Sequence, residues 1–244
     1  MAATALPTAL PTPLANAVAP SGPAATDERL LAVAERLFAR DGIDGVSVRS
    51  ITIEAEANIA AVHYHFGGKP DLVRALVERR VDEVNAARLV MLRAAERAPA
   101  VTARDIAVVW IEPLARLALD PERRAYLGFL VALQHAGPTM RALGTEAFRP
   151  HFPRHDVLLT RAFPHLGAPV RRMRFGLAVD MSMRALADLE HLRGPWVAAG
   201  ESPESRELID AIIDAFSGLL EGGTPIASTR PRVTAPEQRS QTTT

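Results

Sequence analysis

Histidines at close spacing are the first feature of this sequence that could carry out chemistry. His63 and His65 lie two residues apart, and His151 and His155 lie four apart. Imidazole groups at short spacing can bind a metal ion or act as acid and base. In a helix, however, His63 and His65 point apart, and Pro153 disrupts the helical geometry between the second pair. We therefore expect no enzyme, no metal site and no cofactor, and keep a His-based metalloenzyme as an alternative.

A second set of side chains suits the groove of a DNA duplex. The segment begins at Asn58, a preferred helix N-cap, and ends at Gly67, which leaves about two turns of helix. So short a helix is not stable alone, so its neighbours must hold it for a reason other than core formation. Val62 and Phe66 are spaced to face inward. The outer face then carries small, imidazole and phenol groups, namely Ile59, Ala60, His63 and Tyr64.

Two preceding helices are expected to position this short helix. Thr26 can cap a helix that ends at Asp41 and Gly42, with apolar residues at helical spacing. Ser47 can cap the next helix, and Val46 and Ile51 are spaced as a hydrophobic staple. Together the three helices predict a helix-turn-helix unit.

The rest of the chain also has helical periodicity. No alternating pattern of strands and no internal repeat occurs, so we expect an all-α protein. Further helices are predicted over residues 72–97, 101–119, 121–135, 169–192 and 203–220, with short helices and loops over 139–167. The predicted domains are a disordered arm (1–25), a DNA-binding domain (26–86), a helical ligand-binding and dimerisation domain (87–221) and a disordered tail (222–244).

The composition excludes several classes of protein. The chain has 244 residues, of which 48% are hydrophobic, and it contains no cysteine. This rules out disulfides and thiolate metal sites and allows a buried core. No apolar run approaches the roughly 20 residues that span a bilayer, and residues 1–25 lack the Lys and Arg of a secretory signal. We expect a cytoplasmic protein with no membrane partner.

The C-terminal domain contains candidates for a ligand pocket and a dimer interface. Aromatic and apolar residues that either line a cavity or form ordinary core are Trp110, Tyr126, Phe129, Leu133, Phe148 and Phe152. An acidic ligand could meet Arg141, Arg149, Arg172 or Arg174, which are otherwise solvated surface residues. The last two helices could form half of an intermolecular four-helix bundle, or simply core, through Phe175, Val179, Met183, Leu186, Leu208, Ile212 and Phe216.

The block from Leu30 to Val77 resembles the DNA-binding domain of the tetracycline-repressor (TetR) family of bacterial regulators. It carries the motif LF-x-x-x-G at the end of the first helix, V-S-V-R-x-I at the start of the second and Y-H-F-G-x-K at the end of the third. The resemblance implies an all-α homodimer whose short recognition helices enter successive major grooves of a palindromic operator in double-stranded DNA. It also implies that a small-molecule effector, of unknown identity, releases this repressor from DNA.

The resemblance also implies roles for particular residues. Ser47 and Arg49 match a phosphate-facing pair, and Lys69 matches a phosphate-binding lysine. His63 stands where many relatives have a phosphate-contacting tyrosine, and Tyr64 follows it. The first turn of the recognition helix, where base edges are met, comprises Asn58, Ile59, Ala60 and Ala61. Asn58 is either a cap or an adenine contact.

Two features depart from the family pattern. Glu56 lies in the turn between the second and third helices, where relatives usually have glycine because the backbone needs a positive φ. Charge is the other departure, because residues 27–80 hold eight cations (29, 36, 40, 49, 69, 74, 79, 80) and nine acids (27, 28, 35, 41, 44, 54, 56, 71, 78). A helical interaction protein that has lost specific DNA binding is therefore an alternative.

Overall fold

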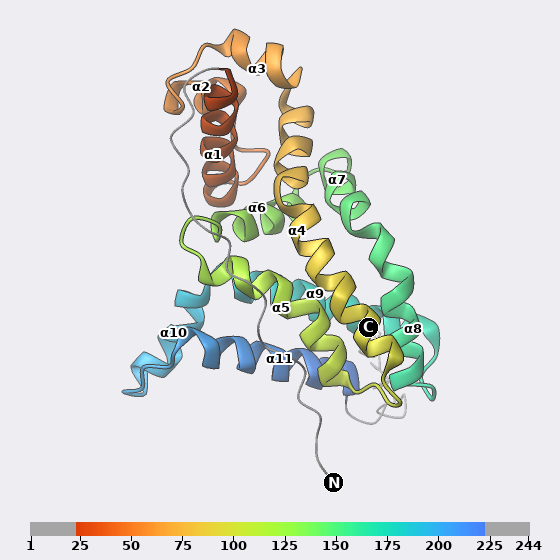
Figure 1. Cartoon of the computed structure of the whole chain (residues 1–244). Coiled ribbons are helices and arrows are strands. Elements are labelled where there is room, and N and C mark those ends of the chain that lie inside the picture. The colour runs from red at the N-terminus through yellow and green to blue at the C-terminus, as the bar shows by residue number, and fades with distance from the viewer. Residues whose placement is uncertain (1–22, 223–244) are drawn as a thin grey trace, which may run out of the picture. The chain divides into compact units, whose positions relative to one another are not determined.

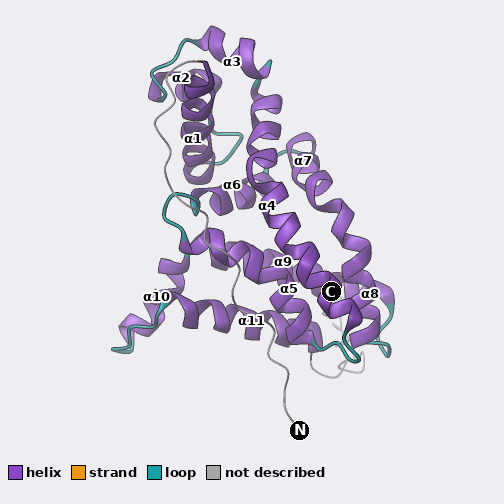
Figure 2. Cartoon of the chain, in the orientation of Figure 1, coloured by secondary structure: helices purple, strands orange, loops and turns teal. Residues whose placement is uncertain are grey.

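Every regular element in the described part of the chain is a helix. The structure, a computed structural model, describes residues 23–222 (Figures 1 and 2). Its elements are α1 (Pro23–Asp41), α2 (Val48–Glu54), α3 (Ile59–Phe66), α4 (Lys69–Arg97), α5 (Ala103–Leu119), α6 (Ala125–His135), α7 (Pro138–Phe148), η1 (Arg149–His151), α8 (Phe152–Ala162), α9 (Ala168–Ala187), α10 (Leu189–Ala198) and α11 (Ser205–Glu221). The expected all-α class is confirmed. Within this range no helix is long and apolar enough to cross a membrane.

Local capping explains where the first helices begin and end. The Ser47 hydroxyl accepts a hydrogen bond from the Ser50 amide at 3.0 Å, and the Ser50 hydroxyl accepts one from the Ser47 amide at 3.1 Å. Asn58 Oδ1 accepts from the Ala60 amide at 2.9 Å and so begins α3. These bonds satisfy amides that have no partner inside a helix. The predicted N-caps Ser47 and Asn58 are confirmed. The predicted cap Thr26 is wrong, because α1 begins at Pro23 and Thr26 lies inside it.

One predicted helix is split in two. The sequence predicts a single helix over residues 169–192, whereas α9 ends at Ala187 and α10 begins at Leu189. Asp188 leaves the helical conformation, with φ −141° and ψ 71°, and its carboxylate accepts from the His191 amide at 3.0 Å. The aspartate therefore caps a new helix inside an apolar run that reads as continuous.

The described residues form two compact units. Residues 23–81 and 128–147 make the first unit, and residues 82–127 and 148–222 make the second. This division differs from the domain boundaries expected from the sequence, because residues 128–147 pack with the N-terminal helices. The predicted arm and tail lie outside the described residues, apart from residues 23–25, which begin α1, and residue 222.

The core of the first unit joins α1 to the short helices and to α6. Phe38 is fully buried, and its ring centroid lies 6.2 Å from that of Phe129. A Cβ at Gly128 would come within 2.9 Å of the Ala39 Cβ, so only glycine allows this close approach of α6. Val62 anchors α3 in this core with 0% exposure. The presentation of α3 thus depends on neighbouring helices, as its length predicts.

The core of the second unit is built mainly from α5, α9 and α11. The ring of Phe175 on α9 lies edge-on to Trp110 of α5 at 5.6 Å and to Phe216 of α11 at 5.9 Å. Both α5 and α9 pack along α11. The Arg88 guanidinium of α4 lies over the Trp110 indole ring, 4.2 Å from its centroid. These aromatic contacts fix α4, α5, α9 and α11 around one buried centre.

Candidate nucleic-acid interface

The outer face of α3 is open to solvent. Ile59 is 47% exposed and Tyr64 is 85% exposed, although both are large apolar or aromatic side chains. Ala60 and His63 are also exposed. Because residues four apart lie on the same side of a helix, these two pairs make one continuous face. Val62 alone of this two-turn helix is fully buried, so most of α3 is a face from which side chains can reach a partner.

The turn between α2 and α3 holds Glu56 in a left-handed conformation. Its φ is 51°, the only positive value of a non-glycine residue among residues 23–222. The Glu56 amide donates to the Ile53 carbonyl at 3.2 Å, and the Ala57 amide donates to the Thr52 carbonyl at 2.9 Å. This pair of bonds is a Schellman helix end, in which the left-handed position usually belongs to glycine. The positive φ expected at this position is therefore present.

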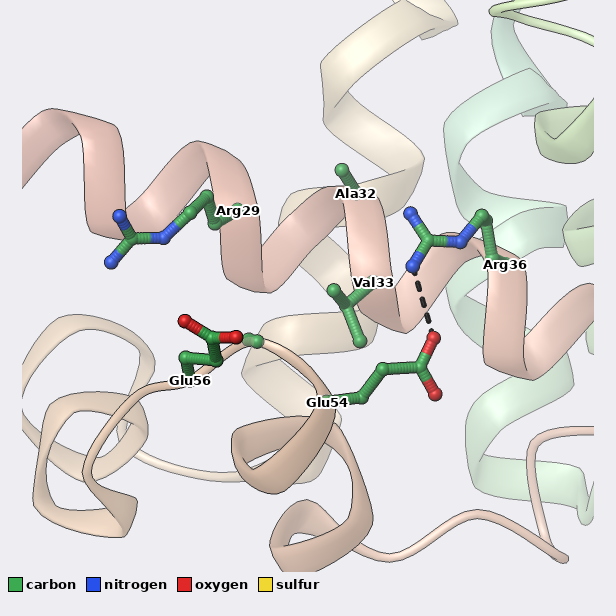
Figure 3. Close-up of a pocket in the computed structure, with 7 residues that line it drawn as sticks. Arg29, Ala32, Val33, Arg36, Glu54 and Glu56 are labelled. Carbon is green, nitrogen blue, oxygen red and sulfur yellow. Dashed lines mark hydrogen bonds and ion pairs between the residues drawn. The ribbon is translucent and has the colours of Figure 1, made fainter.

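An open depression lies beside this turn. Its volume is ≈ 320 Å³, and α1 lines one side with Arg29, Ala32, Val33 and Arg36 while the end of α2 lines the other with Glu54, Ala55 and Glu56. An ion pair of 2.9 Å between Arg36 and Glu54 crosses it, as Figure 3 shows. This exposed ion pair links the end of α2 to α1.

Replacing Glu56 by glycine should stabilise the protein. A non-glycine residue in the left-handed region costs about 1–2 kcal/mol, part of which glycine loses again as chain entropy. We expect Glu56→Gly to raise the free energy of unfolding by about 1 kcal/mol in urea titration. Glu56→Gln is the matched control, because it removes the charge and keeps the backbone cost. Equal stability of the two variants would contradict this explanation.

The expected phosphate contacts differ in how freely their side chains extend. Ser47 and Arg49 are exposed at the start of α2, and Arg49 forms no ion pair with any residue of the described range. The Lys69 ammonium lies 5.9 Å from the Phe38 ring centroid. Partial burial lowers the pKa of Lys69, while Asp44 acts against this. Lys69 must therefore extend away from the protein to meet a phosphate.

Most acids of the first unit are paired within the protein. Glu54 pairs with Arg36 at 2.9 Å, and Asp71 pairs with Arg74 at 2.5 Å. Arg79 holds Glu28 and the buried Glu35 of α1, although burial still raises the pKa of Glu35. Each of these pairs joins a cation to an acid, so together they account for much of the near-zero net charge of the unit. Arg49, which remains outside such pairs, is available to meet DNA phosphates.

The remaining predicted residues of the interface point in different directions. Tyr64 extends into solvent, whereas the imidazole Nδ1 of His65 lies 2.9 Å from an Asp27 carboxylate oxygen on α1. His63 is exposed, with its Nδ1 3.1 Å from the Gly67 carbonyl. Asn58 uses Oδ1 as the cap, so only its amide nitrogen is left to donate to DNA. Ala61 is half-buried at the edge of the face.

The predicted pocket residues fall in both units. Phe129 and Leu133 are buried in the first unit. Trp110 and Tyr126 are buried in the second unit, where Phe148 is half-buried and Phe152 is 39% exposed. Trp110 and Phe148 share one neighbour, since the Arg88 guanidinium lies 4.2 Å and 5.6 Å from their ring centroids.

The predicted dimer residues are mostly covered within the chain itself. All of these residues lie on α9 or α11. Val179 is half-buried. The others are buried, namely Phe175, Met183, Leu186, Leu208, Ile212 and Phe216. The exposed apolar residues of α9 are Val170, Met173 and Leu177. α9 thus has a second, exposed apolar face.

His151 and His155 are buried in the second unit. His155 is 1% exposed, and its Nδ1 lies 2.9 Å from the His151 carbonyl. Nearby Asp156 pairs with Arg172 at 2.9 Å, and Arg174 donates to carbonyl groups at the end of α11. Within residues 23–222 no three His, Asp or Glu side chains are grouped to hold a metal ion.

The burial of His155 should make stability depend on pH. Burial lowers the pKa of His155 to about 4 from a usual value near 6.5. Between these values the unfolded chain binds a proton that the folded chain excludes, so stability falls as the pH falls. We expect the free energy of unfolding to drop by about 2 kcal/mol from pH 7.5 to pH 5. Urea titrations measure this, and a profile for His155→Phe as steep as that of the wild type would contradict the assignment.

Arg88 is a buried residue of interest that sequence reasoning did not identify. It is 0% exposed, between the buried Val84 and Leu92 on the inner side of α4. The available signal was its position, since residues 84, 88 and 92 repeat every four residues along one helix face. Of the four arginines that the sequence offers to an acidic ligand, Arg174 is half-buried and the others (141, 149 and 172) are exposed.

Comparison with known proteins identifies the N-terminal segment. Residues 30–76 match the family described as bacterial regulatory proteins, tetR family. These residues contain α2, α3, the turn with Glu56 and the start of α4, so the match covers the candidate interface. The chain matches no curated protein.

Solved structures share the fold over most of the chain. A TetR-family transcriptional regulator from Streptomyces coelicolor is 21% identical, with a TM-score of 0.52 over 80% of this chain and 88% of that one. The fatty acid degradation regulator FadR from Bacillus halodurans is 17% identical, with a TM-score of 0.52 over 82% and 97%. FadR from Bacillus subtilis, in complex with stearoyl-CoA, is 15% identical, with a TM-score of 0.50 over 78% and 97%. At these identities the likeness shows the fold alone.

Proposed function

We propose that this chain, which is a DNA-binding transcriptional regulator of the TetR family, is a dimeric repressor that a small molecule releases from a palindromic operator. Members of this family are transcription factors and not enzymes. The observation that carries the proposal is the exposed face of α3, with Ile59 and Tyr64 open to solvent on a helix too short to serve the core. Such a protein acts in the cytoplasm, where bacterial DNA lies.

The proposed contacts divide into positioning and reading groups. Ser47, Arg49 and Lys69 contact phosphates, with His63 and Tyr64 beside them, and so fix the register of the protein on the duplex. Base edges are met from the first turn of α3. There the Asn58 amide can donate to an acceptor, and the small Ala60 and Ala61 side chains allow close approach to thymine methyl groups. Ile59 lies in the same turn.

Dimerisation is proposed to use α9 and α11. Both helices were expected at the interface, and most of the residues predicted there are covered by their own chain. The contacts with a second copy are therefore assigned to the exposed apolar side chains of α9, Val170, Met173 and Leu177, and to Leu219 of α11. Two such pairs of helices form a four-helix bundle in which each copy contributes the same surface.

Selection of duplexes from a random library, followed by footprinting, tests this proposal. We expect the bound sequences to be palindromic, with half-sites about one helical turn, roughly 34 Å, apart. Protection should cover two successive major grooves. Selected sequences without two-fold symmetry would contradict the dimeric mode. The alternative, a helical interaction protein, is favoured only by Glu56 and the neutral charge, and would yield no enriched sequence.

A further inference from the structure

Arg88 carries a positive charge that no acidic side chain balances. It is fully buried, and no Asp or Glu in the described part of the chain forms an ion pair with it. Burial lowers the pKa of Arg88 to about 9, so the guanidinium stays charged at neutral pH. Moving such a cation out of water is costly unless it is paired or hydrogen-bonded. A cation on the inner face of α4 therefore needs an explanation.

The protein satisfies this guanidinium only in part. Its Nη2 donates to the Trp110 carbonyl at 3.3 Å, which is a long bond. The ring of Trp110 lies 4.2 Å away and that of Phe148 lies 5.6 Å away, so cation–π attraction contributes. Nε and Nη1 have no hydrogen-bond partner. The N–H groups of both nitrogens remain free to donate to an acceptor.

Other buried polar atoms around Arg88 also lack partners. Trp110 Nε1, His151 Nδ1 and His155 Nε2 are each buried without a hydrogen bond. The rings of Trp110 and His155 are 5.6 Å apart. His151 and His155 have lowered pKa values, first because of burial and then because of the charge of Arg88. Buried polar groups in proteins are usually satisfied, so several unsatisfied ones in one place indicate a missing partner.

We propose that the cluster of Arg88, Trp110, His151 and His155 binds the anionic group of the effector, a carboxylate on an apolar body. The identification of this anion as the effector rests on the proposed function. A carboxylate accepts hydrogen bonds from guanidinium and indole N–H groups. The rings of Trp110, Phe148 and Phe175 suit an apolar body.

The charge of the site favours a monoanion. Because burial lowers the pKa values of both His151 and His155, their imidazoles are neutral at neutral pH, and Arg88 contributes the single positive charge of the cluster. A dianionic phosphate ester would leave one negative charge uncompensated in the interior. Phe148 is half-buried, whereas Trp110 is buried. Arg88 belongs to the same helix, α4, as Lys69 of the proposed DNA interface.

Thermal-shift measurements on the full chain test the proposal with defined probes. The probes are 3-phenylpropanoate and octanoate, each beside its neutral amide, and phenyl phosphate. We expect at least one carboxylate, at about ten times its Kd, to raise the melting temperature by about 3 °C. Its amide and the phosphate should give no shift. No shift with either carboxylate, or equal shifts with acid and amide, would overturn the proposal.

Two sets of variants assign the shift to Arg88. Arg88→Met keeps an unbranched apolar stem and removes the guanidinium charge, so it should fold and lose the carboxylate shift. Arg116→Met, the same change at an exposed position of α5, should keep it. If Arg88→Met does not fold, Trp196→Phe leaves Trp110 as the only tryptophan, and its fluorescence should change with the carboxylate. An unchanged Trp110 signal, or a shift that persists in Arg88→Met, refutes the assignment.

A DNA-binding assay separates this inference from the proposed function. If the chain binds its operator but no carboxylate, the anion site is wrong and the regulator stands. If the carboxylate binds in an Arg88-dependent manner but no operator is found, the site stands and the proposed function fails. If both hold, the carboxylate should weaken operator binding by about tenfold or more, as a coupling of typical size gives.

Discussion

Replacing Leu177 by arginine should convert the proposed dimer into a folded monomer that binds the proposed operator at least about 100-fold more weakly. Leu177 is 55% exposed on α9, so the change introduces a charge at the proposed interface without disturbing the core. When one recognition helix of a dimer binds its half-site, the second recognition helix is held close to the other half-site. This raises the affinity by a factor on the order of 10²–10⁴. A monomer loses that gain.

Sedimentation and anisotropy together measure this effect. The wild type should sediment as twice the 26.3 kDa chain, and Leu177→Arg as a single chain with unchanged helical circular dichroism. Val157→Arg is the matched control, because Val157 of α8 is 53% exposed but lies outside α9 and α11. A variant that stays dimeric, or a monomer with full DNA affinity, would rule out the proposed role of this α9 face.

Ala60→Glu should abolish specific DNA binding while leaving the fold intact. Ala60 is exposed in the first turn of α3, where a glutamate would face phosphates and base edges in the groove. An unfavourable contact in one half-site typically costs about 1–3 kcal/mol, and a dimer incurs it twice. We therefore expect a loss on the order of 100-fold or more, measured by anisotropy with the operator duplex.

The control for Ala60→Glu must carry the same charge elsewhere. Ala94 is exposed on α4, outside the helix-turn-helix region, so Ala94→Glu alters net charge equally. It should retain nearly full affinity if α3 is the reading element. Comparable losses in both variants would mean that only net charge matters, and would remove the reason to assign base contacts to α3.

Local chemistry made the helix-turn-helix region predictable. Ser47 and Asn58 act as caps through hydrogen bonds to amides within three residues, so their roles can be read from neighbouring residues. The positive φ of Glu56 was expected from the resemblance to the TetR family, whose members usually have glycine at this turn position. Asp188 shows the limit of this reasoning. Its carboxylate caps α10 inside an apolar run whose periodicity hides the break.

Features that depend on tertiary packing could not be predicted in the same way. Periodicity indicates that Phe175 and Phe216 lie on apolar faces, but it does not say whether the chain itself or a second copy covers them. In the structure their rings pack edge to face, with the ring centroids 5.9 Å apart. Arg88 was missed for a related reason. An arginine in a long polar helix is usually solvated, and only the packing of Trp110 and Phe148 against it reveals its burial.

The most direct test of the central claim is the salt dependence of binding to the DNA upstream of the chain's own gene. Fluorescence anisotropy compares this duplex with a scrambled one of equal length at low and at physiological salt. We predict that the upstream duplex binds about 10³-fold more tightly or better, and that affinity for both falls as salt rises. Equal affinity for the two duplexes, or no binding even at low salt, would contradict the assignment of this protein as a sequence-specific regulator.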